Sequence, residues 1–205
     1  METKTVSAHE PNALKHAADV LQHGGVVAFP TDTVYGLGAM AFDEDGIMRL
    51  YLIKRRNHSK AIAVLISGID ELERVADSPS KEAINLAEHF WPGPLTLVLP
   101  RHPEMPDSLS TTATIGVRVP DHPAALELLK MVGPLAVTSA NLSEEQNAHT
   151  AENVLEQLSG RVHLILDGGK TPGGIPSTVI DCSKPEIEIL RPGPLKENEL
   201  LSVLS

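Results

Sequence analysis

The chain has 205 residues and a formal net charge of −10, and 41% of its residues are hydrophobic. This size and composition fit one globular domain with its own core, and the acidic balance argues against non-specific nucleic-acid binding, which needs a basic surface. Cys182 is the only cysteine, the first ten residues are polar, and no apolar run reaches the ~20 residues of a membrane span. We therefore expect a single domain over residues 1–205 in the reducing cytoplasm, with no membrane segment.

Hydrophobic periodicity predicts helices and strands that mostly alternate along the chain. Helices are expected near residues 14–21, 47–54, 70–76, 80–90, 123–131, 150–158 and 197–204. Strands are expected at residues 26–29, 62–66, 95–99, 115–119, 135–138, 162–166, 178–182 and 187–190. Several strands are apolar throughout, which is typical of a sheet covered on both faces. The pattern predicts an α/β fold with a mixed sheet, a core over about 13–195 and a short helical tail over 196–205.

The polar loop Pro30–Gly38 follows the first expected strand. It packs three hydroxyls and a carboxylate into six residues. It is either an ordinary turn-rich connection or a binding loop at the carboxyl end of a buried strand, where α/β sheets usually bind ligands. Gly36–Ala41 also matches the dinucleotide fingerprint G-x-G-x-x-A, but six residues separate it from the strand that it should follow directly. NAD binding is therefore not expected.

Cations concentrate in two places. Five of the 17 Lys and Arg residues lie between Arg49 and Lys60, and no Asp or Glu occurs between Asp45 and Asp70. This patch is either a solvated helix end or an anion site, and on extended chain Lys54 and Arg56 would point to the same side. Arg118 lies inside an apolar strand, so it must pair either with an internal acid or with the carboxylate or phosphate of a ligand.

Three further segments carry polar or rigid residues. Trp91–Thr96 contains two prolines around a glycine, which favours a structural corner. Thr138–Ser143 places small hydroxyl and amide groups after a strand, and Asp167–Thr178 is rich in glycine but lacks the P-loop pattern. No G-x-S-x-G, H-E-x-x-H or C-x-x-C occurs, and the nine histidines show no metal-ligand spacing, so we expect neither a nucleophilic hydrolase nor a protein metal site.

In this order the segments resemble one family, the YrdC-like threonylcarbamoyl-adenylate synthases, over roughly Ala13–Leu195. The motifs that carry the resemblance are Pro30–Gly38, Lys54-x-Arg56, Trp91–Thr96, Arg118-Val119-Pro120, Ser139-x-Asn141, Pro176-Ser177-Thr178 and Arg191-Pro192-Gly193. Each alone is weak, and their shared order is specific. The resemblance implies a YrdC/RibB-like fold, in which a twisted mixed β-sheet with flanking helices surrounds a deep positively charged cavity.

The resemblance also implies an activity. L-threonine, bicarbonate and ATP would give threonylcarbamoyl-adenylate and pyrophosphate, and a separate transferase complex would pass the group to tRNA next to the anticodon. The threonine site would comprise Thr31, Tyr35, Arg118, Thr138 and Ser177. The ATP site would comprise Lys54, Arg56, His58, Ser139, Asn141 and Arg191, with Lys54 and Arg56 catalytic. Mg²⁺ would arrive with ATP and retain several waters, without a protein cage.

The chain departs from the family pattern at four positions. Asn57 and Ala61 stand where prolines are usual, Leu65 stands near a usual histidine, and Glu144 replaces a common glycine. Ten residues follow Leu195, too few for the extra carboxyl-terminal domain of the longer members. The alternatives are a non-catalytic paralogue that binds tRNA, double-stranded RNA or the ribosome through the cavity, and a carbamoyl-transfer domain acting on carbamoyl phosphate.

Overall fold

The computed structural model describes residues 2–204, in which helices and strands alternate largely as expected. The strands are β1 Lys4–Ser7, β2 Val27–Phe29, β3 Gly36–Met40, β4 Ala63–Leu65, β5 Leu95–Pro100, β6 Thr114–Arg118, β7 Leu135–Ser139, β8 Leu164–Asp167, β9 Thr178–Asp181 and β10 Glu188–Arg191. The helices are α1 Ala13–Gln22, α2 Glu44–Lys54, α3 Lys81–Phe90, α4 Pro123–Val132, α5 Ala151–Leu158 and α6 Glu197–Leu204. Two short 3-10 helices, η1 Ile69–Arg74 and η2 Asp107–Leu109, complete the described elements.

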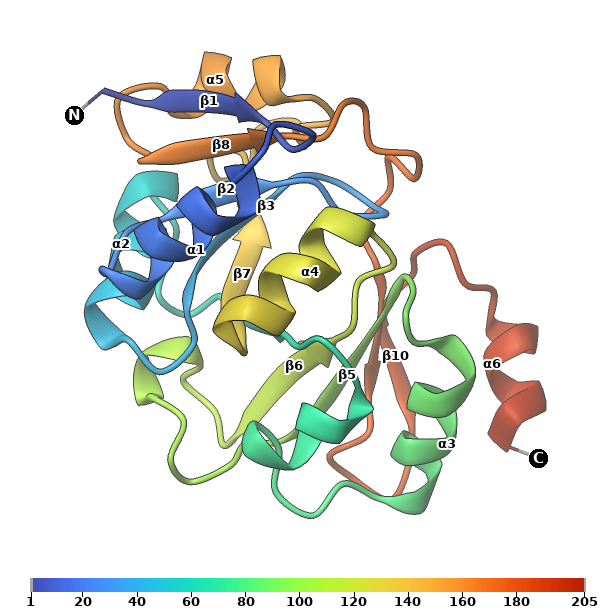
Figure 1. The fold of residues 1–205 in the computed structure, drawn as a ribbon. Helices are drawn as coiled ribbons and strands as arrows, with labels where there is room; N and C mark the ends of the chain where they lie inside the picture. The colour runs from blue at the N-terminus through green and yellow to red at the C-terminus, as the bar shows by residue number, and fades with distance from the viewer. Residues whose placement is uncertain (1, 205) are drawn as a thin grey trace.

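The strands form one ten-stranded sheet in the order β1-β8-β2-β3-β7-β4-β6-β5-β9-β10. The pairs β1/β8, β2/β8, β4/β6 and β5/β9 are parallel. The pairs β2/β3, β3/β7, β4/β7, β5/β6 and β9/β10 are antiparallel. The predicted mixed sheet is therefore confirmed, and it connects the two ends of the chain, because β1 and β10 form its edges (Figure 1).

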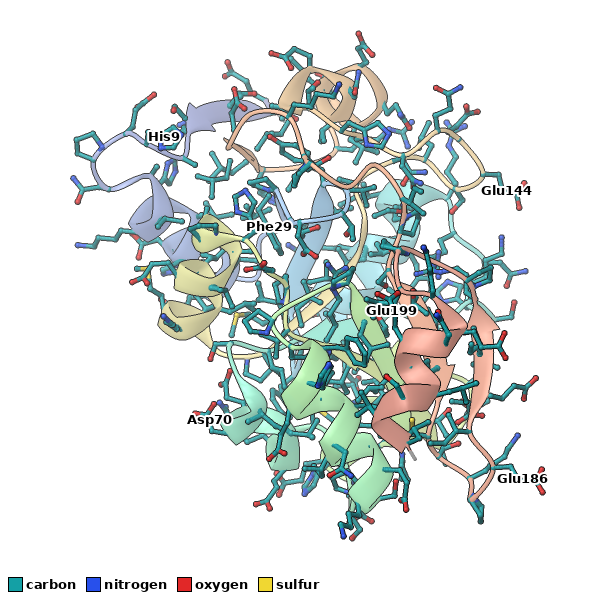
Figure 2. The ribbon with its side chains drawn as sticks, turned by 90° about the vertical axis from the view of Figure 1, so that its right-hand side faces the viewer. His9, Phe29, Asp70, Glu144, Glu186 and Glu199 are labelled. Carbon is teal, nitrogen blue, oxygen red and sulfur yellow. The ribbon has the colours of Figure 1, made fainter. Side chains whose placement is uncertain are left out.

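Apolar side chains cover both faces of the sheet, as the unbroken apolar strands predicted. On one face α1 and α4 pack side by side over β2, β7 and β8 (Figure 1). Val27 and Phe29 of β2 point into this layer, and Phe29 is fully buried (Figure 2). Ala28 belongs to the larger core on the other face, which includes side chains of α2, α3 and α5. Each residue of β2 is thus buried on one face or the other.

Hydroxyl side chains cap the starts of two helices. Ser80 precedes α3 and accepts a hydrogen bond from the backbone N–H of Ala83, and Thr150 caps α5 in the same way through Asn153. Pro123 opens α4, where the missing N–H costs nothing. No helix among residues 2–204 is long and apolar enough to cross a bilayer. The helix expected at 70–76 is the 3-10 turn η1, a correction to the sequence prediction.

Strand β3 was expected to be part of the polar loop, and this prediction was wrong. A Cβ atom on Gly36 would lie 2.9 Å from Val137 Cγ1, and one on Gly38 would lie 2.9 Å from Phe29 Cε1. The two glycines therefore allow large neighbouring side chains to cross the strand. Because glycines also signal turns, the sequence pattern concealed a strand in the middle of the sheet.

Candidate functional site

A cavity of about 330 Å³ lies against the part of the sheet that runs from β3 to β10 in the strand order. Strands β3, β4, β5, β6, β7, β9 and β10 all contribute to its wall. Eight of the eleven residues predicted from the sequence line it, namely Thr31, Tyr35, Arg56, Arg118, Thr138, Ser139, Ser177 and Arg191. Segments as distant in sequence as the loop after β2 and the last strand thus meet at one place.

The loop after β2 is held by its own side chains. Thr31 is buried, and its hydroxyl donates to the carbonyl of Val34 at 2.7 Å and lies 3.0 Å from the Thr33 hydroxyl. Tyr35 lines the cavity, but its hydroxyl donates to the carbonyl of Gly169 at 2.7 Å. Burial raises the pKa of Tyr35 to about 12, so the phenol stays protonated and can keep donating.

Arg118 ends β6, and the structure shows the internal acid partner that was one of the two readings left open by the sequence. Its Nε donates to the carbonyl of Gly93 at 2.9 Å, its Nη1 to the Thr33 hydroxyl at 3.0 Å, and its Nη2 to the Asp32 carboxylate. The residue is 6% exposed and also lines the cavity. Burial lowers the pKa of Arg118, and the Asp32 carboxylate opposes that shift. Arg118 is therefore an internally paired cation at the cavity wall.

Two more arginines reach the cavity without an acidic partner among residues 2–204. Arg56 donates to the carbonyls of Lys60 at 3.0 Å and Ala61 at 2.8 Å, and Arg191 donates to the carbonyl of Ser177 at 2.8 Å. Burial lowers the pKa of both, and for Arg191 the charge of Arg56 adds to the shift. Two cations that repel each other across a cavity are suited to an anion between them.

Lys54 is placed differently from the sequence expectation. It is the last residue of α2, Arg55 follows in the left-handed conformation at φ 53°, and the extended geometry predicted for this stretch is wrong. Its side chain is 1% exposed and does not line the cavity. The Nζ donates to the carbonyls of Ser139 and Asn141, so Lys54 holds the turn after β7 from behind.

His58 and Asn141 also lie outside the cavity wall. His58 is exposed and stacks on Tyr51, with ring centroids 4.4 Å apart. The Asn141 amide donates to the carbonyls of Leu142 at 2.8 Å and Glu145 at 2.9 Å, which shapes the loop after the turn. Neither these two residues nor Lys54 lines the cavity, so their predicted ATP-binding roles stay predictions.

The sequence reasoning missed three polar residues of the cavity wall. They are Thr33, Thr96 and Asn147. Thr33 lies two residues from Thr31 in the recognised loop, and this spacing could have indicated it. The Thr96 hydroxyl lies 2.8 Å from the Ser177 hydroxyl, but Thr96 belongs to a segment for which the structural reading was favoured. Asn147 lies in a long loop with no periodic signal.

The glycine-rich segment 168–177 packs onto the loop after β2. The backbone N–H of Gly174 donates to the Thr33 carbonyl at 2.9 Å. A Cβ atom on Gly173 would lie 2.5 Å from the Asp32 carbonyl oxygen, and one on Gly168 would lie 2.6 Å from Pro30 Cγ. Glycine is needed at these two positions because Gly173 approaches the backbone of Asp32 and Gly168 approaches the ring of Pro30. The segment thereby delivers Ser177 to the cavity.

The fold and the site define an α/β protein with a cavity whose wall combines apolar side chains with three arginines and several hydroxyl groups, and no Asp or Glu among residues 2–204 lines it. The family model Sua5/YciO/YrdC, described as "Telomere recombination", matches residues 19–193. The chain belongs to this family, as its motifs indicated.

The relatives agree with this assignment. The chain is 39% identical over 205 residues to the threonylcarbamoyl-AMP synthase of Bacillus subtilis, covering 98% of this chain and 59% of that protein. It superposes on Pyrococcus abyssi Sua5 solved with L-threonine at a TM-score of 0.94 and 38% identity, covering 100% of this chain and 61% of that one. For E. coli YciO the TM-score is 0.84 at 27% identity, with 95% and 97% covered. The chain thus spans about three fifths of the length of the first two relatives.

Proposed function

We propose that the protein is a threonylcarbamoyl-AMP synthase, a nucleotidyltransferase that makes threonylcarbamoyl-adenylate and pyrophosphate from L-threonine, bicarbonate and ATP. The observation that carries the proposal is the composition of the cavity wall. Three arginines from different elements converge there with hydroxyl side chains, and no carboxylate of the described residues lines the wall to oppose an anion. The names of the relatives and the L-threonine bound to one of them support the same activity.

The proposed chemistry needs no protein nucleophile. The amine of threonine and bicarbonate form a carbamate with loss of water. A carbamate oxygen then attacks the α-phosphate of ATP, the bond to the β-phosphate oxygen breaks, and pyrophosphate leaves. The protein aligns the reactants and neutralises their charge, as in phosphoryl transfer generally.

The geometry suggests how the cavity is divided. Arg118 would bind the threonine carboxylate, near Thr31, Thr33 and Ser177. Arg56 and Arg191, which lack acidic partners among the described residues, would face the phosphates. Lys54 would act by holding the turn that carries Ser139 rather than by touching ATP. Because no carboxylate in the part of the chain that the structure describes lines the cavity, Mg²⁺ would enter as the magnesium complex of ATP, with phosphate and water as its ligands.

The product would serve a separate transferase complex that modifies tRNA, and this step, the cytoplasmic location and any direct binding of tRNA or double-stranded RNA stay predictions. The test of the activity is direct. The protein is incubated with ATP, Mg²⁺, bicarbonate and L-threonine, and the adenylate and pyrophosphate are measured. Arg56→Ala should lower turnover at least about tenfold, because it removes a charged phosphate ligand. Pyrophosphate release that does not depend on threonine would contradict the proposal.

A further inference from the structure

Asp32 stands directly behind the cavity wall. Its neighbours Thr31 and Thr33 line the cavity, whereas Asp32 is not among the lining residues, and its side chain is 12% exposed. Its carboxylate oxygen Oδ1 accepts hydrogen bonds from Arg118 Nη2 and from the backbone N–H of Asp121 at 3.1 Å. A carboxylate held by a backbone N–H as well as by the arginine has a fixed position. Asp32 can therefore fix the orientation of the Arg118 guanidinium that it binds.

Arg118 donates hydrogen bonds to three residues and still has unused N–H donors. A guanidinium carries five N–H groups. Within residues 2–204 one N–H on each of its three nitrogens is used, by Gly93, Thr33 and Asp32. One N–H remains on each terminal nitrogen, so two donors are still available to the carboxylate of a ligand in the cavity. The three contacts fix the plane of the guanidinium and leave these two donors unused.

We propose that Asp32 is a positioning residue that orients the Arg118 guanidinium for the carboxylate of the amino-acid substrate. This rests on the proposed function, in which Arg118 binds that carboxylate. Asp32 itself touches no substrate. The opposite arrangement, in which Asp32 competes with the substrate and must be displaced, fits the contacts less well, because the backbone N–H of Asp121 holds the carboxylate in place and two arginine donors are already free.

The test compares Asp32→Ala with Asp32→Asn. Alanine removes both contacts, whereas the asparagine oxygen can still accept from Arg118 and from the Asp121 N–H. The matched control is Asp121→Asn, which removes a neighbouring exposed charge but keeps the backbone N–H that Asp32 uses. The KM for threonine, the KM for ATP and the kcat of pyrophosphate release are measured for each, with threonine binding by calorimetry and a melting curve as a check on folding.

We expect Asp32→Ala to raise the KM and Kd for threonine by about tenfold or more, the scale of a hydrogen bond to a charged group, with the KM for ATP within about twofold. Asp32→Asn should recover most of the loss, and Asp121→Asn should resemble the unaltered protein. A lower threonine KM in Asp32→Ala would show competition instead of positioning.

Two other outcomes would also overturn the inference. Equal changes in both KM values would show a general structural role, and an asparagine variant as impaired as the alanine variant would show that charge, not orientation, matters. If Asp32→Ala does not fold, the threonine KM of Asp32→Asn decides, since a rise of about tenfold there would again contradict orientation by hydrogen bonding. Failure of the proposed function would appear separately, as an unaltered protein that releases no pyrophosphate with threonine.

Discussion

Replacing Lys54 with methionine tests whether this residue is a buried positioning group. Burial lowers the pKa of Lys54 from its ordinary value of 10.5 to about 7, and the charge of Arg56 adds to the effect. The unfolded chain therefore binds more protons than the folded protein between these two values. Because stability rises with pH wherever the unfolded state binds more protons, Lys54 should contribute a gain in stability from about pH 7 upward.

The magnitude follows from the size of the shift. Between about pH 7 and pH 9 the unfolded state stays almost fully protonated at this lysine, and the folded state loses its proton, so the gain is about 2 kcal/mol. Methionine cannot titrate and has no such gain. It also leaves the carbonyls of Ser139 and Asn141 without the Nζ donor, at a pH-independent cost of about 1–3 kcal/mol each. The deficit of Lys54→Met should therefore widen as the pH rises.

Urea unfolding of both proteins at about pH 7, 8 and 9 measures this difference, in which the other titrating groups cancel. Lys60→Met is the matched control, because Lys60 is exposed and its ion pair with Glu144 at 3.2 Å contributes little. Its difference from the unaltered protein should not change with pH. A Lys54→Met deficit that stays constant over the same range would refute the reasoning, and would mean that the two carbonyls keep the ammonium charged.

Three further outcomes are expected. Arg118→Lys should weaken threonine binding by about 1.5–3 kcal/mol, measured by calorimetry, and should also lower stability, since lysine cannot make the contacts to Gly93, Thr33 and Asp32 together; unchanged threonine affinity would remove Arg118 from the substrate site. Gly173→Ala should reduce kcat without abolishing folding, because its Cβ would lie 2.5 Å from the Asp32 carbonyl and push the segment that carries Ser177 away; full activity would show that the segment is free to move. Serine should be a weak substrate, as one lost methyl costs ~1–3 kcal/mol, and valine should give no adenylate, so equal rates with valine would contradict the pocket.

Much of the fold follows from the sequence, because buried strands and amphipathic helices leave a clear pattern. The strand at 26–29 was recognisable since every residue in it is apolar, and both faces of β2 are buried. Strand β3 was not, because the small residues that let Phe29 and Val137 cross it look like turn residues. Strand β1 was missed for another reason: it is a half-exposed edge strand and lacks the apolar run.

Some positions in the candidate site could be predicted from the sequence and others could not. Polar residues on a strand or in its following loop, such as Arg118 and Thr31, were predicted to meet at one place, and both line the cavity. Lys54, the last residue of α2, does not line the cavity, because the direction of its side chain depends on partners elsewhere in the chain. Here the partners are backbone carbonyls at Ser139 and Asn141, 85 and 87 residues away. Backbone acceptors leave no trace in a sequence, so a lysine bound to them looks the same as a lysine that awaits a phosphate.

The departures from the family pattern can now be weighed by position. Glu144 has φ 72°, the left-handed region that suits the usual glycine, and its side chain points outward to Lys60 at the periphery (Figure 2). Asn57 accepts from the backbone N–H of Ser59 at 2.9 Å. Ala61 uses its carbonyl to hold Arg56, and a proline would offer the same acceptor.

Leu65 is the departure that alters the chemistry of the cavity wall. Ala61 also belongs to that wall, but what it supplies to Arg56 is a backbone carbonyl that does not depend on its side chain. Leu65 is 5% exposed and presents only apolar atoms, whereas a histidine near this position would present a hydrogen-bonding nitrogen. Leu65 is therefore the departure that places a large apolar side chain in the cavity wall, whereas the Glu144 side chain pairs with Lys60 outside that wall.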